Sequence, residues 1–289
     1  MVSTPALSTV VLEVSQRDMF EHVLNDELIG TSIWVNIGLA GLSLLLFAFM
    51  ARNVKDPRSQ LIIVSAMIVS AVSLASYSGL ASGLTISVLE MPEGHAMAGE
   101  SFELAGSGEE VDGTISLWGR YLTWAISTPF ILLALGLLAG SNITKIFTAI
   151  VFDVGIMVTG LAAALTTSSH LMRWWWYAIS CAFFAVVLYI LLVEWPEDAK
   201  AAGTYEIFNL VRWLTVVLWL GYAVVWALGN EGTAVIESSG ITSWAYSAFD
   251  IVAKYVFSFL VISWTIKNQD IVSKGQSFGA TGDAIPADD

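Results

Sequence analysis

Seven long apolar segments dominate this 289-residue sequence and restrict what it can fold into. A helix needs about 20 mostly apolar residues to cross the hydrocarbon core of a bilayer. Lipid cannot satisfy backbone polar groups, so a single spanning segment of this kind must be helical. The sequence therefore predicts an all-α membrane protein with seven transmembrane helices. We place them at roughly residues 31–51, 59–88, 115–139, 143–165, 171–195, 204–229 and 242–267.

The composition agrees with a membrane protein and argues against a nucleic-acid partner. Hydrophobic residues make up 56% of the chain and charged residues only 13%, which is more apolar than a soluble domain. The formal net charge is -13, and nucleic acid would be repelled by it. We therefore expect no nucleic-acid partner. Acidic loops on an apolar body are also consistent with a cell that lives in concentrated salt.

The basic residues between the predicted spans indicate how the chain is oriented. Cytoplasmic loops of membrane proteins carry an excess of lysine and arginine. Here Arg52, Lys55 and Arg58 follow the first span, and Lys145 and Lys200 follow the third and fifth. We therefore expect an extracellular N terminus and a multi-pass protein of the cell membrane. The expected parts are an extracellular segment (1–30), a seven-helix transmembrane domain (31–267) and a cytoplasmic tail without fixed structure (268–289).

The predicted outer loop at about residues 89–114 is long, glycine-rich and acidic. Loops of such length inside a compact domain are either functional or disordered. The sequence leaves two alternatives open, an ordered cap over the outer face and a floppy acidic loop. His95 lies in this loop, and we expect it to be an ordinary exposed residue.

Four ionisable residues fall within the predicted spans, where a charge is costly and marks a functional site by default. They are Arg120, Asp153, Asp250 and Lys254. Asp250 and Lys254 are one helical turn apart on the same face, so the carboxylate can neutralise the cation. A plain buried ion pair is one interpretation. The other is that Lys254 is a desolvated, nucleophilic amine that forms a Schiff base with an aldehyde cofactor.

Aromatic side chains on neighbouring spans could enclose such a cofactor. Trp219, Tyr222 and Trp226 are spaced three and four apart on the sixth span, so they share one face. Aromatic stripes are more often plain packing or interface belts. Together with a lysine at mid-membrane, however, they predict a slot for a long, flat, apolar chromophore. The third span adds Trp124 and Thr128, and the fifth adds Trp176, Tyr177 and Ser180.

These residues resemble the microbial rhodopsins and, within them, the archaeal halorhodopsins. The resemblance covers nearly the whole chain, from about residue 14 to residue 267. It is carried by residues 120–129, which read RYLTWAISTP, by residues 219–226, and by residues 250–254, which read DIVAK. One departure is Ala223, where the family usually has a proline. The missing proline removes a cause of helix bending and restores a backbone donor.

The resemblance implies a cofactor and its pocket. The cofactor is all-trans retinal, attached to Lys254 as a protonated Schiff base, with Asp250 as a counterion. Asp153 corresponds to a structural acid near the ring end that is bonded to a neighbouring helix. The residues implied to line the polyene or close the pocket around its ring are Trp124, Thr128, Ile156, Gly160, Tyr177, Ser180, Trp219, Tyr222 and Trp226.

A count of charges around Lys254 favours an anion as the transported ion. The protonated base on Lys254 and the guanidinium of Arg120 are two cations, and Asp250 is the only fixed anion that we can place nearby. The local sum is one positive charge. A mobile halide can complete this balance.

The third span also lacks the carboxylates with which proton pumps of this family relay a proton. Thr123 and Ala134 occupy those two positions. The hydroxyls of Thr123 and Ser127 lie on one face and can donate hydrogen bonds to an anion. The alternative is that they bond to carbonyls of their own helix. The expected chloride ligands are Thr123, Ser127, Arg120, Lys254, Asp250 and Trp124.

The resemblance implies a light-driven inward chloride pump, an ion transporter and not an enzyme, in which isomerisation of retinal drives alternating access. Thr215 and Arg212 are implied on the release side, Arg120 and Glu231 on the uptake side, and His95 as a weaker candidate there. Related proteins often form homotrimers with lipid or carotenoid in the grooves, and we expect the same.

Three other functions stay open at this point. A sensory rhodopsin signalling through a transducer shares the pocket, but it normally keeps an acidic residue where this chain has Thr123. A light-driven proton pump requires the missing carboxylates. A seven-span transporter or membrane enzyme without a chromophore would be colourless after addition of retinal.

Overall fold

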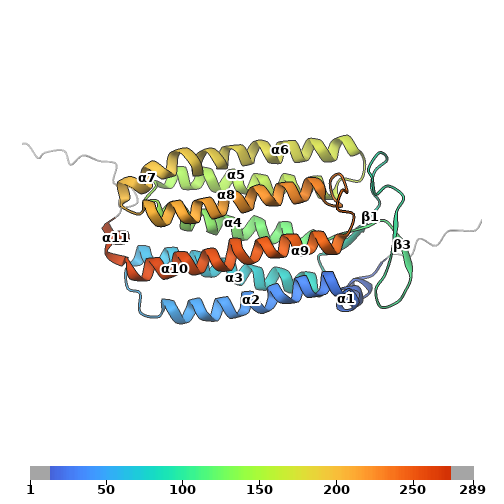
Figure 1. Cartoon of the computed structure of the whole chain (residues 1–289), viewed down its shortest axis with the longest axis horizontal. Coiled ribbons are helices and arrows are strands. Elements are labelled where there is room, and N and C mark those ends of the chain that lie inside the picture. Colours follow the sequence, from blue (N-terminus) through green and yellow to red (C-terminus); the bar gives the residue numbers. More distant parts are fainter. Residues whose placement is uncertain (1–13, 275–289) are drawn as a thin grey trace, which may run out of the picture.

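The computed structural model of the chain describes residues 14–274 and shows a bundle of long helices (Figure 1). Seven helices in this part of the chain are long and apolar enough to cross a membrane, which confirms the predicted fold class. The outer ends of the predicted N-terminal segment and tail lie beyond the described residues. The spans are α2 (Glu27–Ala51), α3 (Pro57–Ala81), α4 (Gly119–Leu138), α5 (Ile143–Leu165), α6 with α7 (His170–Ala202), α8 (Tyr205–Leu228), and α9 with α10 (Ser239–Lys267).

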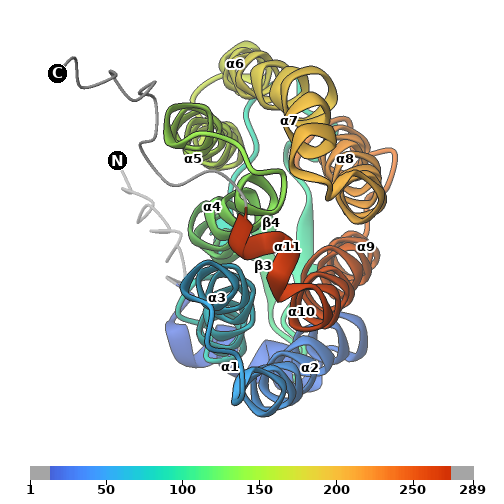
Figure 2. The same cartoon turned by 90° about the vertical axis from the view of Figure 1, so that its left-hand side faces the viewer.

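Seen along its axis, the bundle is a ring of helices (Figure 2). Helix α11 (Gln269–Lys274) lies across one end of this ring, which is the predicted cytoplasmic end. Helix α1 (Gln16–Asn25) and four short strands lie at the other end. The helical α11 corrects the expectation that the whole segment from residue 268 onward has no fixed structure.

Polar caps fix where most of the spanning helices begin. The side chains of Asp26, Asp56, Asn142, Ser169 and Ser238 each accept a hydrogen bond from a backbone N–H in the first turn of the helix that follows. Such a bond satisfies one of the donors that a helix start leaves unpaired. These capping residues explain why the starts differ from our predictions by only a few residues.

Two predicted boundaries were wrong at the outer side. Helix α3 ends at Ala81 and does not continue to residue 88, because Gly83 has a positive φ of 73° and turns the chain. The third span does not begin at residue 115, because residues 114–116 form a strand and α4 starts only at Gly119.

The outer loop is an ordered cap, which decides between the two alternatives left open by the sequence. Strand β1 (Ser87–Leu89) pairs antiparallel with β4 (Thr114–Ser116), and β2 (Ser101–Glu103) pairs antiparallel with β3 (Glu110–Asp112). The β2–β3 hairpin is attached to α1, since the backbone N–H of Ala105 donates to Nδ1 of His22 at 2.9 Å.

Two of the spans contain a π-helical turn, a wider turn that is frequent at functional sites. In the fifth span the π-turn η1 (Ile190–Glu194) lies between α6 (His170–Tyr189) and α7 (Trp195–Ala202), so the helix extends beyond the predicted end at residue 195. In the seventh span η2 (Ile251–Val256) separates α9 (Ser239–Asp250) from α10 (Phe257–Lys267).

Candidate functional site

Lys254 and Asp250 form an ion pair in the interior of the bundle. Lys254 lies in the π-helical turn η2, and its side chain is only 1% exposed. Its Nζ donates to Oδ2 of Asp250 at 2.8 Å. The ammonium in this structure stands in for the nitrogen that would carry an aldehyde cofactor. The spacing of the two residues along the seventh span therefore brings them together as expected.

Asp250 accepts hydrogen bonds from three further helices as well as from Lys254. The hydroxyl of Tyr77 on α3 donates to it at 2.6 Å and the indole N–H of Trp124 on α4 at 3.2 Å. The hydroxyl of Tyr222 on α8 is the fourth donor. Each donor stabilises the negative charge of the carboxylate, so Asp250 is held as a fixed anion.

Arg120 reaches Asp250 only through a tyrosine. Its Nη1 donates to the hydroxyl of Tyr77 at 3.0 Å, and its Nη2 donates to Oγ of Ser243 at 2.6 Å. Among the described residues no direct ion pair joins Arg120 to Asp250. Arg120 is 3% exposed, and within residues 14–274 no carboxylate lies at ion-pair distance from it. Sequence reasoning missed Tyr77 and Ser243, and their polar groups inside apolar spans were the available signal.

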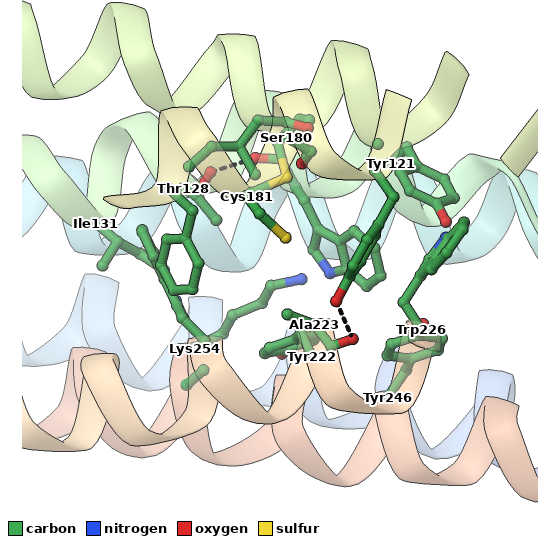
Figure 3. Close-up of a pocket in the computed structure, with 18 residues that line it drawn as sticks. Tyr121, Thr128, Ile131, Ser180, Cys181, Tyr222, Ala223, Trp226, Tyr246 and Lys254 are labelled. Atoms are coloured by element: carbon green, nitrogen blue, oxygen red, sulfur yellow. Dashed lines mark hydrogen bonds between the residues drawn. The ribbon is translucent and has the colours of Figure 1, made fainter. Parts of the chain in front are cut away.

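A cavity beside Lys254 is lined almost wholly by apolar and aromatic side chains, and the amine of Lys254 extends into it (Figure 3). The space between atoms in and around it is about 790 Å³, a figure that includes open solvent at its mouth. All nine residues expected around a polyene line it: Trp124, Thr128, Ile156, Gly160, Tyr177, Ser180, Trp219, Tyr222 and Trp226. Trp176 does not line it. The lining residues that sequence reasoning missed are Tyr121, Ile131, Met157, Cys181, Phe184, Ala223, Tyr246 and Ala253.

The shape and chemistry of this cavity fit a retinal. The side chain of Lys254 supplies, in its unprotonated form, the amine nucleophile that an aldehyde requires, and the walls are otherwise suited to a flat hydrocarbon. Rings of Trp124 and Tyr222 pack edge to face with centroids 5.2 Å apart. At Gly160 an added Cβ would lie 3.4 Å from the ring of Tyr121 and 3.7 Å from Oγ of Ser180, so a side chain there would narrow the slot.

Asp153 lies behind the cavity wall and bonds to a neighbouring helix, as the resemblance implied. It is fully buried on α5, and its Oδ2 lies 2.6 Å from Oγ1 of Thr128 on α4. Oγ1 of Thr128 is also 2.7 Å from the carbonyl of Trp124. A threonine hydroxyl has a single proton to donate. If that proton goes to the carbonyl, Asp153 must be the donor in the other bond.

The two hydroxyls expected to hold an anion differ in this structure. Oγ1 of Thr123 donates to the carbonyl of Gly119 at 3.1 Å, so this residue adopts the alternative in which the hydroxyl bonds to its own helix. Oγ of Ser127 is buried and has no hydrogen-bond partner within residues 14–274. Neither residue lines the aromatic cavity. Ser127 is therefore the hydroxyl that is available to a further ligand.

The predicted uptake side contains a buried carboxyl group. Glu231, in the loop between α8 and α9, accepts from the hydroxyl of Tyr121 at 2.7 Å and from Oγ of Ser116 at 3.4 Å. Burial raises the pKa of the Glu231 carboxyl above its ordinary value. The buried guanidinium of Arg173, which sequence reasoning missed, donates to the backbone carbonyl of Glu231 at 2.7 Å.

His95 is buried, and the expectation that it is an exposed loop residue was wrong. It is only 4% exposed, because the cap folds it against the bundle. Its Nε2 lies 3.4 Å from the carbonyl of Glu231, and its ring packs against the ring of His170. Burial and the neighbouring Arg173 guanidinium lower the pKa of His95, so the imidazole is neutral near pH 7.

The residues implied on the release side lie on α8, away from the aromatic cavity. Thr215 is 2% exposed and donates to the carbonyl of Val211 at 2.9 Å. Arg212 is 7% exposed and donates through Nη2 to the side chain of Asn209. Within residues 14–274, neither Thr215 nor Arg212 forms a hydrogen bond with Lys254 or Asp250.

Comparison with known proteins identifies a family. The model of the family described as bacteriorhodopsin-like protein matches residues 27–268. A halorhodopsin of Natronomonas pharaonis is 64% identical over 96% of this chain and 94% of its own length. A halorhodopsin of Halobacterium sp. (strain SG1) is 59% identical over 97% and 95% of the two chains.

Solved structures show the same similarity. A structure described as halorhodopsin, a light-driven chloride pump, superposes with a TM-score of 0.79 at 52% identity, covering 86% of this chain and 99% of the other. A bromide-bound halorhodopsin from Halobacterium salinarum gives 0.80 at 52% identity over 86% and 98%. A light-driven proton pump from Leptosphaeria maculans gives 0.74 at 25% identity over 85% and 97%. The fold alone therefore does not separate the two kinds of pump.

Proposed function

Because the chain belongs to the bacteriorhodopsin-like proteins and, within them, to the halorhodopsins, we propose that it is a light-driven pump that moves chloride or another halide into the cell. The protein is then a multi-pass transporter of the plasma membrane, not an enzyme. The observation that carries this proposal is the charge balance around Lys254, where the hydrogen-bonded network that links Lys254 and Arg120 contains one carboxylate, Asp250.

The aromatic cavity is the proposed retinal site. Lys254 would hold the cofactor covalently through its amine, and Trp124, Trp219 and Tyr222 would enclose the chain. Bound retinal supplies the absorption of light and an isomerisation that changes the direction in which the nitrogen of Lys254 presents its proton. The protein supplies the rest, which is a fixed anion beside the nitrogen and a wall that excludes water.

The halide is proposed to occupy the place of the missing negative charge. Asp250 carries a single negative charge, so it neutralises only one of the two cations, Lys254 and Arg120. The unpartnered Oγ of Ser127 can donate to a halide. A charge in the interior of a membrane protein is tolerated only when it is paired, and the anion completes the pairing.

Helix α4 lacks the carboxylates that would accept and return a proton, so the proposed transported ion is the anion. Thr123 and Ala134 replace the two carboxylates that a proton relay would require, and neither can take up a proton at neutral pH. We place uptake near Arg120 and Glu231, and release near Thr215 and Arg212. Movement of one negative charge into a cell with a negative interior costs about 2.3 kcal/mol per 100 mV.

Light-driven transport in cells tests this function directly. A chloride pump makes the interior more negative, so protons enter passively and a protonophore increases this light-induced uptake. A proton pump instead acidifies the medium, and a protonophore abolishes the effect. Acidification of the medium, or the absence of any current in liposomes that contain only this protein, would refute the proposal and favour a proton pump or a sensory protein.

Halide binding can be measured separately from transport. We expect a saturable shift in the visible spectrum when chloride replaces sulfate at constant ionic strength. A pigment that is indifferent to the anion would contradict the proposed halide site. A protein that stays colourless after addition of all-trans retinal would contradict the cofactor site itself.

A further inference from the structure

Helices α6 and α8 both line the aromatic cavity. Tyr177, Ser180 and Phe184 line it from α6, and Ala223 and Trp226 belong to the part contributed by α8. Among the described residues, one hydrogen bond joins these two helices. The hydroxyl of Tyr177 donates to the backbone carbonyl of Ala223 at 3.0 Å, which the dashed line at Ala223 marks in Figure 3.

The ring of Tyr177 contacts the same stretch of α8. It stacks on the indole of Trp226 with centroids 4.6 Å apart and an interplanar angle of 13°. Trp174, one turn earlier on α6, packs its edge against both rings, at 5.5 Å from Tyr177 and 5.6 Å from Trp226. Tyr177 thus holds α8 at two points one turn apart, by its hydroxyl at Ala223 and by its ring at Trp226.

The residue at position 223 allows this arrangement. Alanine keeps its backbone N–H, and α8 runs without interruption from Tyr205 to Leu228. A carbonyl oxygen has two lone pairs, so that of Ala223 can accept from Tyr177 while it also takes part in the helix. The small side chain leaves the carbonyl within reach from α6.

We propose that Tyr177 is a positioning residue, whose hydrogen bond to the carbonyl of Ala223 sets the separation of α6 and α8 and thereby the width of the cavity between these two helices. Cavity width decides which ring size an aldehyde of the retinoid class can have. The identity of that ligand rests on the proposed function, but the bond between the helices belongs to the protein without cofactor.

The test without cofactor compares Tyr177→Phe with Tyr189→Phe in the purified full-length apoprotein. Tyr189 lies on the same helix and is 56% exposed, so its variant is the matched control. Amide hydrogen exchange of α8 over residues 223–228 should become roughly threefold faster in Tyr177→Phe, the effect expected for one interhelical hydrogen bond in a membrane protein. Exchange equal to that of the control would overturn the proposal.

The test with cofactor uses retinal and analogues with smaller or larger rings. Tyr177→Phe should increase the uptake of a large-ring analogue relative to all-trans retinal by roughly threefold and shift the absorption maximum, and Tyr189→Phe should do neither. An unchanged ring preference would overturn the role in selectivity. If the wild-type apoprotein takes up no retinal at all, the proposed function fails, and hydrogen exchange still decides whether the bond positions α8.

Ala223→Pro provides a second variant. A proline keeps the carbonyl but removes the N–H and pushes on the preceding turn, which displaces the acceptor from Tyr177. If the bond positions α8, Tyr177→Phe should have little further effect on exchange in the Ala223→Pro background. Fully additive effects of the two substitutions would contradict the proposal.

Discussion

At the scale of single residues, Ser127 and Thr123 differ in a way that binding measurements can detect. Ser127 has an unpartnered hydroxyl, whereas the hydroxyl of Thr123 already donates to the carbonyl of Gly119. Hydrogen bonds to charged groups are worth about 1.5–3 kcal/mol. We therefore expect Ser127→Ala to weaken halide binding at least about tenfold, and Thr123→Val to weaken it by much less.

The measurement is a halide titration of the visible spectrum with sulfate as the replacement anion. Thr148→Val is a suitable control, because Thr148 also bonds to a carbonyl of its own helix but lies on α5, away from the ion pair. If Thr123→Val weakened binding more than Ser127→Ala, the assignment of the free donor to Ser127 would be wrong.

Tyr77 provides a second prediction at this scale. Its buried hydroxyl lies between Arg120 and Asp250 and bonds to both. Tyr77→Phe would leave each charged group short of one partner, and a buried polar group without a partner costs about 1–3 kcal/mol. We expect a lower thermal denaturation temperature and a shifted absorption maximum, with Tyr189→Phe as the control. An unchanged absorption maximum would show that the hydroxyl does not affect the charge on Asp250.

The sequence predicted those site residues that share one helix face. Asp250 and Lys254, and likewise Trp219, Tyr222 and Trp226, are related by simple helical spacing. Tyr77 could not be found in this way, since its contact with Asp250 spans 173 positions of the chain. The direction of the Thr123 hydroxyl was equally open, because the same side chain can bond to its own helix or to a ligand.

At the scale of elements, the cap is predicted to respond to pH. The β2–β3 hairpin is held on α1 by His22, whose Nδ1 must be unprotonated to accept from Ala105. Burial lowers the pKa of His22, although the charge of Asp26 opposes this shift. The attachment is therefore complete above about pH 6.5, the unfolded value, and weakens as the pH falls toward the lower folded pKa.

Amide exchange in the strands measures this effect. In the wild type, the protection factors of residues 101–112, which are the ratios of the intrinsic to the observed exchange rate at each pH, should be lower at pH 5 than at pH 7. In His22→Gln, which has an acceptor oxygen but no titration, this loss of protection at pH 5 should disappear. A wild type and a His22→Gln variant with the same pH profile would rule out His22 as the titrating group.

Element boundaries were predictable where a local signal sets them. The capping residues Asp26, Asp56 and Ser238 occur directly before apolar runs. The early end of α3 was not predicted, because the segment after Ala81 is still mostly apolar, and neither the turn at Gly83 nor the pairing of β1 that follows it is evident from hydropathy. The order of the outer cap likewise depends on pairing between β1 and β4, which are distant in sequence.

At the scale of the whole molecule, the orientation in the membrane can be tested with single cysteines. Cys181 is the only cysteine of the chain, so Cys181→Ser provides a background without thiols. In that background Glu109→Cys should react with an impermeant maleimide on intact cells, whereas Lys55→Cys should react only after lysis. Both positions are exposed. The opposite pattern of labelling would show that the chain has the reverse orientation in the membrane.

The number of spanning helices was predictable from the lengths of the apolar segments, and their orientation from the loops that carry lysine and arginine. Both signals can be read along the whole sequence without knowledge of tertiary contacts. The assembly of several copies stays a prediction, because a single chain does not test it. Seven spans also do not define the transported ion. The assignment of the ion depends on the three charged side chains Lys254, Arg120 and Asp250. It also depends on the hydroxyl groups of Thr123 and Ser127 on α4.

The wide turn η2 has a consequence for how the seventh span is built. A π-turn inserts one residue more than a regular α-turn of the same height would hold, and each residue rotates a helix by about 100°. The inserted residue therefore sets which side of α10 meets α3, where Oγ of Ser258 donates to the carbonyl of Ala66. Deleting any one residue of 251–256 would swing that serine away by roughly a quarter of a revolution while leaving the number of apolar residues sufficient to cross the bilayer.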